Sequence, residues 1–152
     1  MEDDHFDFHK VPVYRTAFQL VLDVLDFLKP LPRERRIDVA NKCGCAMAIV
    51  PAKIVGSRAF SSGVERADYL NISLHNLDEA ARFMQQIADE KLASPEETAP
   101  FLERMAALKV ELLRYQKQSL AFNNSVWDDE TVEWMNELDK EDFDPLDSFS
   151  NN

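Results

Sequence analysis

The chain has 152 residues, of which 45% are hydrophobic and only 3 are glycine, and its formal net charge is −11. This length suits one domain with a real core, and the scarcity of glycine favours long helices over many short strands. No apolar run approaches the ~20 residues needed to cross a bilayer. The acidic residues 1–5 lack the basic and apolar regions of a signal peptide. We therefore expect a cytoplasmic protein that does not act at a membrane.

The negative charge is concentrated at the two ends of the chain. Residues 127–152 contain ten acidic residues and one lysine, a net charge of −9, and residues 1–7 contain four acids and no lysine or arginine. Residues 8–126 hold 16 basic and 14 acidic residues and carry +2. The chain therefore divides into an acidic arm (1–10), a nearly neutral helical body (11–122) and an acidic, aromatic-containing tail (123–152) that we expect to be partly disordered.

Two helices are expected in the first half, separated by a turn with Pro30 and Pro32. Apolar residues at helical spacing predict the first helix over residues 11–28. Its expected buried stripe is Tyr14, Ala17, Phe18, Val21, Leu25 and Leu28. A second helix should start near Arg33 and be kinked or broken by Pro51, whose ring removes a backbone donor. Its expected stripe is Ile37, Ala40, Gly44, Met47 and Val50 or Pro51.

Two capping signals mark the starts of two further helices. Ser62 and Glu65 have the spacing of a capping box, and Ser94 and Glu97 repeat it with Pro95 at the first helical position. The third helix should run to about residue 92, with a stripe of Leu70, Leu74, Leu77, Ala81, Met84, Ile87 and Ala88. The fourth should run to about residue 121, with a stripe of Phe101, Met105, Leu108, Leu112 and Tyr115. Together these features predict an all-α, antiparallel up-down-up-down four-helix bundle with a kinked second helix and an acidic C-terminal tail.

No motif in the sequence nominates a catalytic, cofactor or metal site. A di-iron bundle requires a Glu with a His three residues later on each of two helices, and the one such pair, Glu2 and His5, lies in the N-terminal arm outside the predicted helices. Three scattered glycines cannot form a phosphate loop. Cys43 and Cys45 point to nearly opposite sides of a helix, so we expect small buried thiols and no shared metal or disulfide. His75 is interpreted as a partly exposed helix-face residue, and the alternative is a pH-sensitive or ligand residue. We therefore expect a protein without enzymatic activity and without a cofactor.

Six basic residues are candidates for contact with nucleic acid or a partner. They are Arg33, Arg35, Arg36, Lys42, Lys53 and Arg58. A nucleic-acid surface needs several such charges on one face, and a ring of identical subunits would multiply even a weak patch. The alternative is an ordinary solvated helix surface. A further alternative for the Arg33–Arg36 group is an internal or intersubunit contact with the acidic tail.

The acidic tail contains aromatic residues among its acids, of which Trp127, Trp134 and Phe143 are candidate anchors for a protein partner. Aromatic residues interleaved with acids are typical of segments that dock on a basic, apolar groove. The alternative is a solubilising tail whose aromatic residues fold back on the bundle. This leaves open a second function class, a protein-interaction module that acts through the tail and binds no nucleic acid.

Four segments together resemble the four helix bundle protein family, also called the 23S rRNA-intervening-sequence protein family. The first helix opens with Phe8, Val11, Val13, Tyr14 and Ala17, and its turn carries Leu31, Pro32 and Glu34. The other two segments are residues 48–54 around Pro51 and residues 69–74 with Leu77 and Glu79. The resemblance covers residues 6–121 and leaves out the acidic tail.

This resemblance implies a compact antiparallel bundle that assembles into a homo-oligomer, often a pentameric ring. Related accessory variability determinant proteins of diversity-generating retroelements bind a reverse transcriptase and RNA through a basic surface. We therefore expect a non-enzymatic, oligomeric accessory or scaffold protein. Its partner would be a nucleic-acid-processing protein such as a reverse transcriptase with its RNA.

Overall fold

The computed structural model describes residues 8–121, except for the side chains of Arg35 and Arg36, and its regular structure there is entirely helical. The four long helices are α1 (Pro12–Leu28), α3 (Asn41–Ser57), α4 (Gly63–Asp89) and α5 (Pro95–Leu120). Three short elements complete the set: η1 (Phe8–Lys10), α2 (Arg33–Arg35) and η2 (Arg36–Ala40). Residues 8–121 contain no strand, so the predicted all-α fold with four helices is confirmed.

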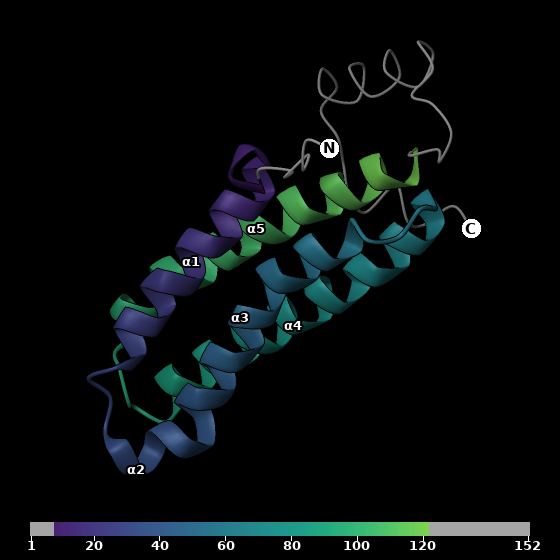
Figure 1. Cartoon of the computed structure of the whole chain (residues 1–152). Helices are drawn as coiled ribbons and strands as arrows, with labels where there is room; N and C mark the ends of the chain where they lie inside the picture. Colours follow the sequence, from purple (N-terminus) through teal and green to yellow (C-terminus); the bar gives the residue numbers. More distant parts are fainter. Residues whose placement is uncertain (1–7, 122–152) are drawn as a thin grey trace.

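The four long helices lie alongside one another (Figure 1) and enclose one core. α1 packs on α3 and α5, and α4 packs on α3 and α5. All four contribute fully buried large side chains, among them Leu20, Met47, Leu70, Leu77 and Leu108. Because each such side chain stabilises the fold by about 1.5–3 kcal/mol when it leaves water, this shared core is what holds the helices together.

The buried face of α1 differs from the predicted stripe. Val13, Leu20 and Val24 are buried although the stripe omitted them, whereas Phe18 and Leu25 were assigned to the core and are 39% and 40% exposed. Successive side chains on a helix are turned by 100°, so the buried face of α1 is rotated about the helix axis relative to the predicted stripe. α1 is apolar over a wider arc than the core uses, so the remaining apolar side chains face outwards.

The second predicted helix consists of three segments. α2 leads into η2, a π-helical turn, and α3 follows it. A π turn holds more residues than an α turn, so it changes which residues face the core. This explains why Ile37, expected in the core, is 68% exposed, whereas Ala40, Met47 and Val50 are buried as predicted. α3 continues through the buried Pro51 to Ser57, so the helix is not broken there.

The two predicted capping sites both begin helices. At α4, the Ser62 hydroxyl accepts a hydrogen bond from the Glu65 amide at 3.4 Å. At α5, the reciprocal box is complete, with the Glu97 amide donating to Ser94 Oγ and the Ser94 amide donating to Glu97 Oε1, both at 3.2 Å. The predicted stripes of both helices face the core, although Leu74, Ala81, Phe101 and Tyr115 are only partly buried there.

One stretch among residues 8–121, Ile37–Ser57, is long and apolar enough to cross a membrane by length and composition alone. It has 21 residues, and a window of 18 residues within it has a mean hydropathy of 1.2, which corrects the expectation that no apolar run approaches this length. Half of that window is buried inside the bundle. A core helix meets the same criterion, so the stretch is weak evidence for a membrane.

Candidate binding surfaces

A groove of about 470 Å³ lies between α1 and α3, and we call it the α1–α3 groove. Its lining is mostly apolar and consists of Leu25, Leu28, Lys29, Ala40, Asn41, Gly44, Cys45 and Ala48. The groove exists because α3 carries small residues where it faces α1. A Cβ at Gly44 would lie only 3.1 Å from Leu25 Cδ2, so the two helices approach closely at this point.

A row of apolar side chains on α1, exposed except for the half-buried Tyr14, continues from this groove, and we call it the α1 stripe. It consists of Tyr14, Phe18, Leu22 and Leu25, spaced four, four and three residues apart, which places them on one face of the helix. Leu22 is 42% exposed, similar to Phe18 and Leu25. The Tyr14 and Phe18 rings stack with their centroids 5.9 Å apart, and His9 meets both rings edge-on. The stripe and the groove together form an apolar face that the bundle itself does not cover.

A second surface lies where α3 ends, α4 begins and α5 ends, and we call it the cationic end. It combines three cations with three aromatic rings: Lys53, Arg58, Phe60, Arg66, Tyr69 and Tyr115. Arg58 Nε donates to the Tyr115 hydroxyl at 3.2 Å and thereby joins the end of α3 to α5. Lys53 Nζ donates to the Tyr69 hydroxyl at 3.1 Å and lies 5.1 Å from the centre of that ring.

Arg66 holds the loop between α3 and α4 in place. Its Nε donates to the Phe60 carbonyl oxygen at 2.7 Å and its Nη2 donates to the Arg58 carbonyl oxygen at 3.3 Å. The pKa of Arg66 is lowered, mainly because the side chain is partly buried and secondly because the Arg58 charge is close to it. The Phe60 and Tyr69 rings pack 5.0 Å apart beside it. The cationic side chains are therefore held in place before any ligand arrives.

The six predicted basic residues separate into two groups. Arg33 is exposed at the start of α2, Arg35 ends α2, Arg36 begins η2, and Lys42 is exposed in the first turn of α3. Lys53 and Arg58 belong to the cationic end. Along the axis of α3 they lie about 16 Å and 24 Å from Lys42, at 1.5 Å per residue. The structure therefore does not bring all six together in one subunit. The predicted tail anchors Trp127, Trp134 and Phe143 lie outside the described residues.

Four members of the cationic end are not among the residues predicted to bind a partner: Phe60, Arg66, Tyr69 and Tyr115. Two of them have other predicted roles, Tyr69 in the family resemblance and Tyr115 in the core stripe. The signal that was present is the density of cationic and aromatic residues on both sides of the α3–α4 turn. What the sequence could not show is that α5 returns to the same place and brings Tyr115 to Arg58.

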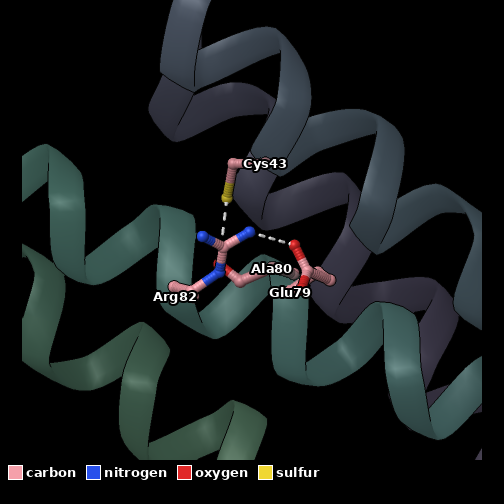
Figure 2. A network of polar contacts seen from close by, with 4 residues as sticks. All are labelled: Cys43, Glu79, Ala80 and Arg82. Atoms are coloured by element: carbon pink, nitrogen blue, oxygen red, sulfur yellow. Dashed lines mark hydrogen bonds and ion pairs between the residues drawn. The ribbon is translucent and has the colours of Figure 1, made fainter.

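The two cysteines occupy different environments, so the prediction that both are buried is wrong for one of them. Cys43 is buried, and its Sγ donates to the Ala80 carbonyl oxygen at 3.5 Å. Figure 2 shows this contact beside the ion pair between Glu79 and Arg82 on α4. Burial raises the pKa of the Cys43 thiol to about 12. Cys45 is exposed in the α1–α3 groove, because two positions along a helix turn a side chain to another face.

The described residues do not gather the donors that a metal centre needs. Within residues 8–121, no group of three or more His, Cys, Asp and Glu side chains could hold a metal ion. His75 is exposed on α4, as the preferred interpretation expected. Two further cations on α5 are paired within the bundle, Arg104 with Asp23 of α1 at 2.8 Å and Lys109 with Asp78 of α4 at 2.9 Å.

Comparisons of the chain with protein-family models, with curated proteins and with solved structures gave no match. The resemblance to the four helix bundle protein family therefore stays a prediction.

Proposed function

We propose that this protein is a non-enzymatic, cytoplasmic helical scaffold that assembles into a homo-oligomer and presents a composite surface to a nucleic-acid-processing partner. The observation that carries the proposal is the apolar face made by the α1 stripe and the α1–α3 groove. Three large apolar side chains, Phe18, Leu22 and Leu25, are each about two-fifths exposed on one helix face. Contiguous exposed apolar surface of this kind marks interaction sites in soluble proteins.

A second copy of the chain fits this face because the face contains both halves of a contact. The α1 stripe is a ridge of large side chains, and the neighbouring α1–α3 groove has small residues such as Gly44 and Ala48. A ridge from one subunit can therefore enter the groove of another, either reciprocally in a dimer or head-to-tail in a closed ring. We favour a ring of five subunits, as the family resemblance implies. In this ring each subunit is an up-down-up-down bundle with a kink at Pro51.

Light scattering of the full chain during size exclusion tests the assembly. The expected mass is a multiple of the 17.5 kDa chain. Replacement Leu22→Glu should return the mass to that of one chain, because a carboxylate buried in an apolar contact is strongly unfavourable. Val64→Glu on α4 is the matched control, since Val64 is 61% exposed and lies away from the groove. A wild-type chain that stays monomeric at high concentration would contradict the proposal.

The nucleic-acid part of the proposal is supported by Arg33 and Lys42, both exposed near the junction of η2 with α3. One subunit offers few charges there, but a ring repeats them around its circumference. If RNA binds this surface, affinity should fall steeply as salt rises, because binding releases counterions from the phosphates. Anisotropy of a labelled RNA with Arg33→Ala and Lys42→Ala checks this. An oligomer that binds no RNA even at low salt, with or without its tail, would instead favour the tail-dependent protein-interaction module.

A further inference from the structure

The chain leaves α5 beside the cationic end. Arg58 donates to Tyr115 on α5, and Leu120, where α5 ends, lies five residues beyond Tyr115, about 7.5 Å along the helix axis. The acidic tail follows from this point. Six extended residues span about 20 Å, so the tether allows Trp127 to reach Arg58. The other basic group, which includes Lys42, is about 24 Å further away along α3.

The tail and the cationic end are complementary in charge. Residues 127–152 carry a net charge of −9, and an acidic run at 128–130 follows Trp127 directly. The cationic end carries the half-buried cations Lys53 and Arg58, which donate hydrogen bonds to the Tyr69 and Tyr115 hydroxyls. Carboxylates form their strongest hydrogen bonds with such cations, and arginine is the best partner because its guanidinium group binds both oxygens.

The aromatic rings of the two partners are complementary as well. Phe60 and Tyr69 pack against each other at 5.0 Å and are only partly buried, so part of their surface is available to another ring. Tryptophan is also the side chain whose face attracts a cation most strongly. A segment that alternates tryptophan with acids therefore matches both components of the cationic end.

From this geometry we propose that the acidic tail of the same chain docks on the cationic end, with Trp127 and its adjacent acids at Lys53 and Arg58. The tether supports this occupant over a separate molecule, because a linked segment has a high effective concentration at a site near its attachment point. Docking places the tail on two of the six basic residues expected to contact nucleic acid. RNA would therefore be directed to the other basic group, at Arg33 and Lys42. This docking takes place within one chain, so it does not depend on the number of subunits.

Tryptophan fluorescence of the full chain tests this docking directly, because Trp127 and Trp134 are its only tryptophans. Emission therefore reports on the tail alone. Arg58→Glu should shift the emission to longer wavelength and raise quenching by acrylamide towards the values of the urea-unfolded chain. Lys42→Glu, a matched charge reversal on the same helix, should leave both unchanged. Salt at 1 M should act on the wild type as Arg58→Glu does, because it screens the contact.

A second variant separates docking from folding, since Arg58→Glu also loses its bond to Tyr115. Replacing the three acids Asp128, Asp129 and Glu130 by their amides leaves the bundle untouched and should give the same fluorescence change. If neither Arg58→Glu nor the replacement of the three acids changes the emission wavelength and the quenching, the inference is wrong. It is also wrong if the emission changes on dilution, because the tail would then dock on another molecule. Loss of RNA binding in Arg58→Glu with unchanged fluorescence would assign the cationic end to nucleic acid and reject the docked tail.

Discussion

Gly56 lies so close to the Tyr69 ring that a Cβ at position 56 would be 2.8 Å from both Cε1 and the hydroxyl oxygen. Tyr69 cannot easily withdraw, because Phe60 packs on its ring and Lys53 donates to its hydroxyl. The absence of a side chain on Gly56 therefore sets how closely α4 approaches the end of α3. This contact also fixes the ring on which the cationic end is built.

Gly56→Ala should therefore lower the free energy of unfolding by about 1–3 kcal/mol, the usual cost of overpacking. Gly44→Ala is the matched comparison in the same helix. There the new Cβ would meet only the ends of the Leu25 and Leu28 side chains, at 3.1 and 3.4 Å. The exposed Leu25 can shift, and the helix gains up to ~1 kcal/mol from replacing glycine. Urea unfolding of both variants measures the difference, and equal stabilities would show that Tyr69 is not held in place.

The complete capping box makes Ser94 more important to stability than Ser62. Ser94→Ala should cost about 1 kcal/mol, because it removes the hydroxyl that accepts a hydrogen bond from the Glu97 amide and leaves that amide only the Ser94 carbonyl oxygen, at 3.1 Å. Ser62→Ala should cost less, since its one capping bond is longer at 3.4 Å. Thermal unfolding of the two variants, with the exposed loop substitution Ser61→Ala as a control, checks the order. The reverse order would contradict the cap geometry.

Burial of Cys43 predicts a loss of stability at alkaline pH. Its thiol has a pKa of about 12 in the folded chain, whereas the ordinary value is 9.0, so above pH 9 the unfolded chain loses this proton first. The stabilisation is complete below pH 9 and declines above it, by about 1 kcal/mol at pH 10. Cys43→Ser removes the titration and should show a shallower decline in urea unfolding between pH 8 and 10. Parallel curves for the two proteins would refute the assignment.

The exposed Cys45 provides a native probe of the α1–α3 groove. At pH 7 a maleimide should modify one thiol per folded chain, Cys45, and two after unfolding in urea, because Cys43 is buried. If subunits meet at the groove, modification should be slower in the oligomer than in Leu22→Glu. Mass spectrometry of timed samples gives both rates, with Val64→Glu as the control. Identical rates in the wild type and Leu22→Glu would place the subunit contact elsewhere.

The long helices could be predicted because apolar spacing and capping residues involve positions that are close together in the chain. The starts of α4 and α5 follow from the serine caps, and α1 begins within one residue of its predicted start. The buried face of α1 could not be predicted in the same way. Phe18 and Leu25 are as apolar as Leu20 and Val24, so only the positions of α3 and α5 decide which of them enter the core.

The candidate surfaces were predicted less well, because they join residues that are distant in sequence. The α1–α3 groove requires Leu25 to lie beside Gly44, and the cationic end requires Arg58 to meet Tyr115, 57 positions later. Charge counting found Lys53 and Arg58. It could not show that the end of α3 meets α5 through Arg58 and Tyr115, because spacing in sequence does not reveal which end of a helix meets which neighbour.

The wide turn η2 means that this segment has one residue more than a regular helix would need. If residues 36–40 were wound as a regular α-helix, α2 and α3 would form one continuous helix, and Ile37 would lie on the same face as Ala40, Gly44 and Met47. The insertion therefore sets the direction in which Arg33 points relative to Lys42. A change of length by one position within residues 36–38 should therefore turn Arg33 relative to Lys42, while Val39 and Ala40 keep their buried positions.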